Sequence, residues 1–523
     1  MTKSEYADEH RASSKCFLCS IDGLLYYLPL ILTLLYIPIF IVVQSVNKYA
    51  IVSYGDSNSH AVIARAVFDS TEQFSLGTTW LPLYHLLLAP FCAPDILFFN
   101  YISGFALNLI MVFAALTYLR KLLTELQLER PTILFALLLF ALNPDYIYLS
   151  LTPMTETTFI ASCIASAYYF SVFVKQNNFS SAISASFAII PATLIRYESW
   201  FFVPLPMLFA VYETYQTKKT FRQSKAVILG SIVSFAGIVF WIIYNQIAYG
   251  SALGFLGSTK SAGYAPASAH LRLNFPAVGD AFLSNFIPMY GAIISIMVLV
   301  YFFLSFRQKP PFVGHNFIIL FLFAPIAYLL VSLLFGYAQI KVHWNSRYLL
   351  AALPYVITVS AITLDAFSIR ARSATVIGAV IYYLFQAAGY LPLVSYADAQ
   401  NHIYERTFES SYLGGYIADS LNGGRVVHIG GPANSAHRIM MFSKQSLKRY
   451  EVIRCEIADS ISLVKREIEA TRAFQERNSL LILEYRVAGY QGEVIPAIKA
   501  IADECEKIYK VLIKTEYFVV VVR

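Results

Sequence analysis

The sequence predicts a mainly α-helical membrane protein with about eleven transmembrane helices and a small C-terminal α/β soluble domain. Of its 523 residues, 57% are hydrophobic and only 14% are charged, whereas soluble domains carry about a quarter charged residues. Apolar runs long enough to cross a hydrocarbon core of roughly 30 Å recur along the chain. From about residue 395 they give way to a mixed pattern that holds seventeen Lys and Arg residues.

Eleven apolar runs account for the predicted spans. They cover residues 24–44, 96–118, 131–146, 156–174, 181–195, 200–215, 226–247, 280–304, 316–336, 347–364 and 374–393. The run WLPLYHLLLAPF, residues 80–91, is too short to cross and indicates a re-entrant or interfacial segment. Residues 56–70 separate their apolar from their charged positions, which predicts an amphipathic helix lying on the exoplasmic surface.

The distribution of basic residues predicts the orientation. Connections on one side of the predicted spans hold fifteen Lys and Arg residues, and the alternate connections up to residue 393 hold seven. Cytoplasmic loops carry the excess, so we expect the N-terminus in the cytoplasm and the C-terminus outside. The predicted parts are a cytoplasmic tail over 1–23, a transmembrane domain over 24–393 with its first exoplasmic loop over 45–95, and an exoplasmic domain over 394–523.

The polar C-terminal region has the pattern of an α/β domain. RVVHIGG, SLLILEY and YFVVVVR predict strands, and residues 458–475 and 494–507 predict amphipathic helices. The turn in HIGGPANSAHR resembles a phosphate-binding strand–glycine–helix turn, but a single Gly-Gly fits an ordinary βα turn better. Cys455 and Cys505 lie in this region and could pair in an oxidising compartment.

Composition argues against several classes of function. In a membrane protein the net charge of +7 reflects loop topology, so it does not indicate binding of nucleic acid. Cys16 and Cys19 form one CxxC without a second pair or nearby histidines, which disfavours a zinc site. We expect no metal and no other cofactor. The polar, acidic N-terminus is not typical of a cleaved signal peptide, and the first apolar run is long enough to remain as an anchor.

Four segments with reactive side chains fall at span ends on the predicted outer side. They are YGDSNSH (54–60), LNPDYIYLSLTPMTETTF (142–159), LIRYESW (194–200) and IKVHWNSRYLL (340–350). Ionisable residues near membrane depth are functional candidates by default, so we expect these segments to form one polar site. A further outer connection, residues 250–272, is rich in Gly, Ala and Ser and fits either a mobile flap or a simple loop.

Asp56 is the leading candidate in the first segment. It fits a general base that the following helix keeps ionised, and it also fits a plain helix cap. His60, one turn further on, suits a hydrogen bond to a substrate or to Asp56 better than a metal, and Tyr54 belongs to the same candidate set. Arg65 and Asp69, spaced i,i+4, predict an ion pair on the helix surface.

Glu156 begins a predicted span in the second segment. It fits two roles equally well: a second acid near a reacting centre, or a first-turn residue of a helix that Thr152 caps. Asp145 follows Pro144 and is predicted to be a turn residue.

Two arginines complete the candidate site. Arg196 and Arg347 carry positive charge on the outer side and need an anionic partner there. The planar fork of arginine suits phosphate. We favour a phosphate over Asp56 for Arg347, whereas phosphate and Glu198 fit Arg196 about equally. The neighbouring candidates are Tyr348, Lys341 and His343.

The polar strings resemble a known family. GDSNSHAVIARAVFDS, QFSLGTTWLPLYHLLLAPF, ALNPDYIYLSLTPMTETTF and LIRYESWF are similar to the GT-C glycosyltransferases, and within them to the bacterial and archaeal branch related to protein O-mannosyltransferases and aminoarabinose transferases. The resemblance covers residues 24–393. Many relatives have two adjacent acidic residues in the first loop, whereas here Ser57 follows Asp56. The acidic metal ligands of oligosaccharyltransferases are not recognisable.

The resemblance implies an enzyme of the plasma membrane that moves a sugar from a polyprenyl-phosphate carrier to a protein, lipid or glycan acceptor. Asp56 would be the base, and Glu156 the second acidic position. The lipid phosphate would be held by Arg347 and Tyr348, with Lys341, His343 and Arg196 beside them. The chemistry agrees, because a phosphate that leaves already charged needs fixed positive charge and a base opposite it, not a general acid. Such a displacement inverts the anomeric centre.

The alternative from a different class is a transporter or flippase of a lipid-linked substrate. Its usual signature is ionisable residues near mid-membrane and broken helices in paired halves, whereas here the charged residues fall at span ends.

Overall fold

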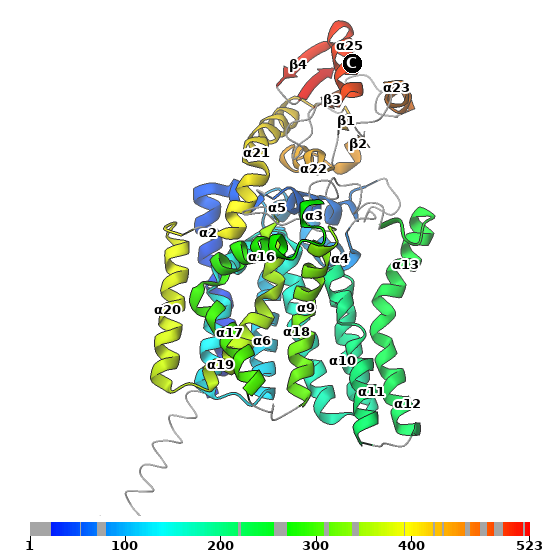
Figure 1. Cartoon of the computed structure of the whole chain (residues 1–523). Helices are drawn as coiled ribbons and strands as arrows, with labels where there is room; N and C mark the ends of the chain where they lie inside the picture. Colours follow the sequence, from blue (N-terminus) through cyan, green and yellow to red (C-terminus); the bar gives the residue numbers. More distant parts are fainter. Residues whose placement is uncertain are drawn as a thin grey trace, which may run out of the picture.

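A computed structural model describes most of the chain. The described residues are 22–52, 54–70, 80–217, 221–255, 269–307, 313–336, 345–391, 393–421, 424–430, 433–454, 461–470, 479–485, 495–515 and 518–522. A bundle of long helices forms one part, and a smaller α/β unit lies beyond one end of the bundle (Figure 1). The long helix α21 (Val394–Ser420) joins the two parts.

Helices and 3-10 turns make up the bundle and its end. They are α2 (Tyr36–Asn47), η1 (Lys48–Val52), α3 (Gly55–Ala66), α4 (Pro82–Cys92), α5 (Asp95–Phe98), α6 (Ser103–Glu125), α7 (Arg130–Ala141), α8 (Pro144–Leu151), α9 (Thr155–Gln176), α10 (Phe179–Thr193), η2 (Tyr197–Phe201), α11 (Leu205–Thr217), α12 (Phe221–Ile232), η3 (Val233–Phe235), α13 (Ala236–Tyr249), η4 (Ala269–Leu271), α16 (Phe275–Tyr290), α17 (Ala292–Arg307), α18 (Val313–Leu334), η5 (Ser346–Ala352), α19 (Leu353–Asp365) and α20 (Ile369–Ala387).

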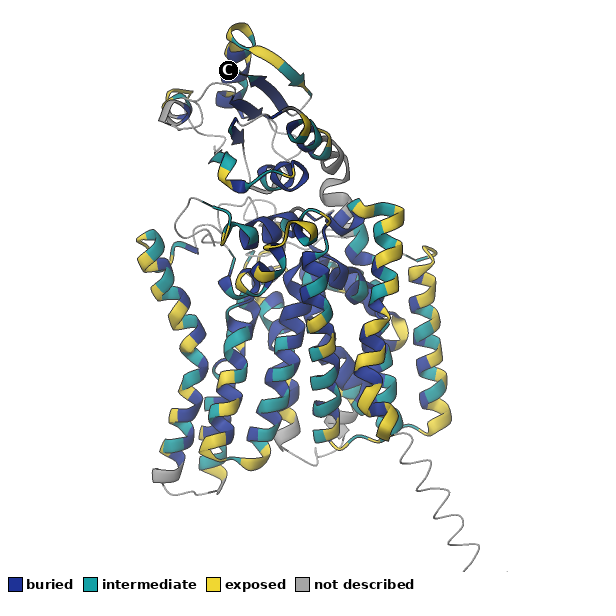
Figure 2. Cartoon of the chain, turned by 180° about the vertical axis from the view of Figure 1, so that it is seen from behind, coloured by how far each residue is buried: buried dark blue, intermediate teal, exposed yellow. Residues whose placement is uncertain are grey.

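The chain is a multi-pass membrane protein. Among the described residues, six helices are long and apolar enough to cross a membrane, or up to eight if each of two bent helix pairs forms one span. Figure 2 shows exposed residues along the outer faces of these helices. Many of them are large and apolar, including Ile243, Leu299 and Phe303, as expected of surfaces that face lipid tails.

The predicted count of eleven spans is not confirmed. Two of the predicted spans are bent pairs: α7 with α8, at 54°, and α16 with α17, at 115°. Pro144 begins α8 and cannot continue the hydrogen bonding of α7, while Gly291 has a φ of +81°, which glycine adopts without steric cost. The segment predicted at 181–195 is only a short apolar helix, α10.

The helix predicted at 56–70 exists as α3, but it does not lie on a surface. Its residues from Ser57 to Ala64 are buried. One side packs against α4 and another against α22 (Ala433–Phe442) of the C-terminal unit. The predicted exposed face is therefore wrong, because the covering helix comes from a region far along the chain.

The C-terminal unit contains a five-stranded sheet of order β2-β1-β3-β5-β4. Its elements are β1 (Val426–Gly430), α22, η6 (Leu447–Arg449), β2 (Tyr450–Arg454), α23 (Ile461–Ala470), β3 (Leu480–Glu484), α25 (Pro496–Ile508), β4 (Lys510–Lys514) and β5 (Phe518–Val522). β1 pairs in parallel with β2 and β3, while β5 is antiparallel to β3 and β4.

All three predicted strands and both predicted helices of this unit are present. The glycine turn of HIGGPANSAHR leads from β1 to α22, although Gly431 and Pro432 lie outside the described residues. β2 and β4 were not predicted because charged residues interrupt their short sequences, YEVIR and KVLIK. Cys505 is buried and free. Cys455, and also Cys16 and Cys19, lie outside the described residues.

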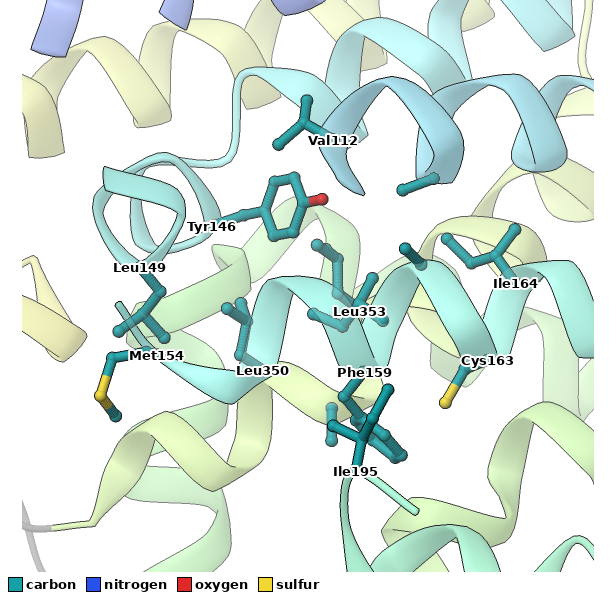
Figure 3. Close-up of a cluster of buried hydrophobic side chains, with 14 of the residues drawn as sticks. Val112, Tyr146, Leu149, Met154, Phe159, Cys163, Ile164, Ile195, Leu350 and Leu353 are labelled. Atoms are coloured by element: carbon teal, nitrogen blue, oxygen red, sulfur yellow. The ribbon is translucent and has the colours of Figure 1, made fainter. Parts of the chain in front are cut away.

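One large apolar core runs from the bundle into the C-terminal unit. It includes one face of the sheet, while the other face packs against α23 and α25 in a second core. In the bundle, side chains from α8, α9 and η5 meet around Leu149, Phe159 and Leu350 (Figure 3). This packing fixes the first turn of α9 and the start of η5, which both carry predicted site residues.

Candidate active site

The first turn of α3 presents Asp56 at the end of the bundle. Tyr54 is the N-cap residue of α3 and has extended backbone, and no side chain caps the helix. The Ser57 hydroxyl instead donates to the Tyr54 carbonyl at 2.6 Å. Asp56 is therefore a first-turn residue and not the cap. Its side chain keeps 24% of its exposure, which leaves the carboxylate accessible.

Arg347 is the partner of Asp56. It lies in η5 directly after Asn345 and Ser346, and Asn345 has a left-handed φ of 56° that turns the chain into this helix. The Arg347 guanidinium donates a short hydrogen bond to Asp56. The rings of Tyr54 and Tyr348 lie 4.7 and 5.4 Å from the guanidinium carbon, close enough for cation–π attraction.

Glu156 and Arg196 form a second, more deeply buried ion pair. One Glu156 oxygen, Oε1, accepts from Arg196 at 2.8 Å and lies 3.7 Å from Nε of Arg347. The other, Oε2, is buried without a hydrogen-bond partner. Arg196 also donates to Glu198 at 2.6 and 2.9 Å, and its guanidinium carbon lies 5.1 Å from the Tyr348 ring.

Three carboxylates and two guanidinium groups thus meet at this site. A buried charge needs a hydrogen-bonded partner of opposite sign, and each of these groups has one. The predicted cap of α9 is wrong: Met154 occupies the N-cap position without a side-chain bond, and the Thr152 hydroxyl donates to Leu149 instead. Glu156 is free of any capping role and lies between the two arginines.

His60 faces a second histidine, and no hydrogen bond among the described residues joins it to Asp56, one of its two predicted partners. Its Nδ1 lies 2.9 Å from Nε2 of His85 on α4, and both rings are buried. The rings of Trp80 and Tyr84 lie 5.0 and 5.3 Å from the His60 ring. Both histidines lie outside the spanning helices. Burial lowers the pKa of His85 to about 3, and burial together with His85 lowers the pKa of His60 well below its usual value.

The structure brings most of the predicted site residues together. Members of all four predicted segments contribute, and the residues in contact are Tyr54, Asp56, Glu156, Arg196, Arg347 and Tyr348. Lys341 and His343 lie outside the described residues. His85 was missed, although a histidine inside the apolar run of residues 80–91 was a signal for a buried polar contact.

The pair predicted at Arg65 and Asp69 is present at 3.4 Å, but each residue has a further partner. Arg65 donates to Asp95 at 2.6 Å. Asp69 accepts from residues of the C-terminal unit. In the part of the chain that the structure describes, no three His, Cys, Asp or Glu residues form a group that could hold a metal ion.

The site lies at one end of a helical bundle, where a carboxylate pairs with arginines, and an α/β unit lies beyond that end. Solved structures share this fold. The model aligns with ArnT from Cupriavidus metallidurans bound to undecaprenyl phosphate at a TM-score of 0.57, with 12% identity over 93% of this chain and 97% of that one.

Two further solved structures align with the model. The apo state of ArnT aligns at a TM-score of 0.55, with 12% identity and the same coverage. An oligosaccharyltransferase from Archaeoglobus fulgidus aligns at 0.47, with 13% identity over 88% of this chain and 70% of that one. No protein-family model matches the sequence, and no curated protein sequence matches it.

Proposed function

We propose that the protein is a membrane glycosyltransferase that moves a single sugar from a polyprenyl-phosphate donor to an acceptor hydroxyl on the outer face of the plasma membrane. The observation that carries the proposal is the meeting of Asp56, Glu156, Arg196 and Arg347, from four separate segments, at one end of the bundle. The shared fold with ArnT, which was solved with a lipid phosphate bound, supports the same class of donor.

The two arginines supply the positive charge that the donor requires. Arginine binds phosphate through two parallel hydrogen bonds. A low-dielectric site strengthens that interaction as charge develops on the leaving phosphate. Arg347 and Arg196 are held 5.4 and 5.1 Å from the Tyr348 ring, so the cations are placed before the donor arrives. In this proposal the phosphate competes with carboxylates for both of them.

Asp56 is the proposed base for the acceptor hydroxyl. It is the most exposed carboxylate of the site, with 24% exposure against 3% for Glu156 and 11% for Glu198. The hydrogen bond from Arg347 holds Asp56 in place before binding. When the donor phosphate binds the Arg347 guanidinium in place of Asp56, the Asp56 carboxylate becomes available to accept a proton. The hydroxyl then attacks the anomeric carbon opposite the phosphate, which inverts the centre.

Glu156 is proposed to hold the two arginines in position and not to take part in the reaction itself. Its Oε1 approaches both guanidinium groups. Its buried Oε2 lacks a hydrogen-bond partner and is available to a hydroxyl of the sugar or the acceptor. A buried acceptor without a partner costs about 1–3 kcal/mol, which a bound hydroxyl would recover. The proposal involves no metal ion, and it keeps the C-terminal unit on the outer side.

The test is donor consumption by purified protein. A panel of labelled polyprenyl-phosphate sugars, with a crude cell-envelope fraction as the source of acceptor, is incubated with the wild type, with Asp56→Asn and with the control Asp22→Asn. Asp22 pairs with Arg130 in an exposed bond away from the site. We expect wild type and control to consume one donor and a folded Asp56→Asn to be inert.

Two results would overturn the proposal. If wild type and Asp56→Asn consume the donor equally, Asp56 is not the base. Absence of any consumption, together with movement of a fluorescent lipid phosphate across vesicle membranes, would favour the flippase alternative.

A further inference from the structure

The C-terminal unit holds both ends of the segment that carries Asp56. At the start of α3, the Tyr54 hydroxyl donates to the Ser395 carbonyl at 2.5 Å, in the first turn of α21. Just beyond the end of α3, Asp69 accepts from the Ser446 hydroxyl at 2.5 Å and from the Leu447 backbone N–H at 3.0 Å. Asp69 thereby supports the first turn of η6, which follows α22.

Asp69 is itself fixed to the membrane-embedded part. Its backbone N–H donates to the Arg65 carbonyl at 3.1 Å, and Arg65 Nε approaches its carboxylate at 3.4 Å. Arg65 also donates to the carbonyls of Cys92 and Ala93 at 2.8 and 2.5 Å. The Asp69 side chain is only 13% exposed, so water competes little for these bonds.

The start of α21 is held from the opposite side by Asp145. The Ser395 N–H donates to Asp145 at 2.5 Å, and both residues are fully buried. Asp145 lies in the first turn of α8, so it is more than the turn residue that its position after Pro144 predicts. The Ser395 peptide unit is thus fixed between α8 and Tyr54, whose ring lies against Arg347.

Apolar contacts strengthen the same docking. Phe442, at the end of α22, meets Tyr49 and Tyr101 edge-on at ring distances of 5.9 and 5.8 Å. Gly414 permits the close approach of α21 and α22, because a Cβ there would lie 2.5 Å from that of Phe442. α22 therefore packs on α3 through a helix that is itself held by apolar contacts with α21 and the end of the bundle.

We infer that Asp69 is a positioning residue for the proposed reaction. Asp69 bonds η6 and so ties the end of α3 to the C-terminal unit. Correct placement of α3 then depends on docking of that unit. Asp56, in the first turn of the same helix, depends on it too. The inference rests on the proposed function. Since displacement of a reacting group by about 1 Å can cost 100-fold in rate, loss of this bond acts on the catalytic step rather than on donor binding.

The experiment compares Asp69→Ala and Ser446→Ala, which remove the same hydrogen bond from its two sides. For each folded variant, kcat and KM for the donor and the Kd for polyprenyl phosphate are measured separately. We expect kcat to fall about 10- to 100-fold, with Kd and KM within about twofold of wild type. The double variant should lose no more than Asp69→Ala alone, and Ser446→Thr, which keeps the hydroxyl, should restore activity.

The matched control is Asp503→Ala. Asp503 also accepts from a side chain within the C-terminal unit, Lys499 at 2.6 Å on α25, but this pair is exposed. It should leave kcat unchanged. Wild-type kcat in Asp69→Ala or Ser446→Ala overturns the inference, and so does a raised Kd with kcat intact. Loss of fold in both variants would assign Asp69 to folding and overturn it equally.

Failure of the proposed function gives a different result. If Asp56→Asn retains activity, the base is misassigned whatever Asp69 does. If Asp56→Asn is inert but Asp69→Ala is fully active, only the positioning role is lost. In an Asp56→Asn background, Asp69→Ala should have no further effect on residual donor turnover, because the group that it positions is already gone.

Discussion

Arg196 and Arg347 approach the same oxygen of Glu156, at 2.8 and 3.7 Å. The two arginines are 151 residues apart in sequence, and a buried carboxylate between them offsets a repulsion that would otherwise separate them. Asp56 and Glu198 neutralise the outer sides of the same pair. The site therefore holds two cations close together, and under the proposed function a lipid phosphate would have to displace carboxylates in order to bind them.

Glu156→Gln should both destabilise the fold and weaken donor binding. Removing one partner of a buried ion pair leaves uncompensated charge and costs about 3–5 kcal/mol. Thermal unfolding in detergent and titration with polyprenyl phosphate would measure the two effects. Glu125→Gln is the control, because the Glu125–Lys175 pair is largely exposed and should change stability by about 0–1 kcal/mol. A Glu156→Gln variant as stable as this control would contradict the prediction.

Arg347→Lys should lower kcat/KM at least 100-fold although it keeps the charge. An ammonium group cannot reproduce the planar fork or its stacking on Tyr54 and Tyr348. Steady-state kinetics with the donor would measure the loss. Arg372→Lys alters another buried, ion-paired arginine, away from the site, and should reduce stability with kcat/KM preserved. Equal losses in the two variants would show a general packing effect.

Stability should fall as the pH falls from about 6.5. The pKa values of His60 and His85 are lowered in the folded state, so below about pH 6.5 the unfolded chain binds protons that the folded protein does not. Each histidine then costs about 1.4 kcal/mol per pH unit until its folded-state pKa is reached. Melting temperatures at pH 7.5 and 5.5 would measure the decrease.

His85→Gln should reduce this pH dependence, since it removes one of the two titrating groups. His270→Gln, which changes an exposed histidine, should leave it unchanged. An identical pH slope in wild type and His85→Gln would assign the acid sensitivity to other groups.

Gly104→Ala should disrupt the site through backbone packing. A Cβ at Gly104 would lie 2.4 Å from Cα of Pro153, and Pro153 precedes Glu156 by three residues. The clash would shift the start of α9, so we expect a loss of stability of about 1–3 kcal/mol together with lower donor turnover. Gly279→Ala is the matched control, because a Cβ there meets nothing within 4 Å, and alanine favours helix by about 1 kcal/mol.

The sequence was sufficient to predict four of the polar residues that the structure brings together. Asp56, Glu156, Arg196 and Arg347 each end or begin an apolar segment, and alternate ends of spans fall on one side of a membrane. The partners could not be predicted in the same way. Arg347 bonds Asp56 across 291 residues, and no local pattern selects that carboxylate over a bound phosphate.

The errors have similar physical causes. The burial of α3 could not be predicted from its own sequence. The side that hydropathy assigned to water is covered by α22, which comes nearly 400 residues later in the chain. The count of eleven spans is not confirmed, since among the described residues only six helices, or eight with the two bent pairs, are long and apolar enough to cross a membrane. Hydropathy also does not register the bends at Pro144 and Gly291. His85 stands out as a histidine inside an apolar run, but the periodicity of that run does not identify His60 as its partner.

The long sequence separations around α3 affect the order of assembly. The segment bonds residues 291, 341 and 377 positions away through Asp56, Tyr54 and Asp69. Contacts so distant in sequence form late, because the chain between them must first be made and ordered. The polar groups of the first loop therefore lack these partners until the later segments have been made. The full set of contacts around Asp56 can exist only after residue 447 has been synthesised.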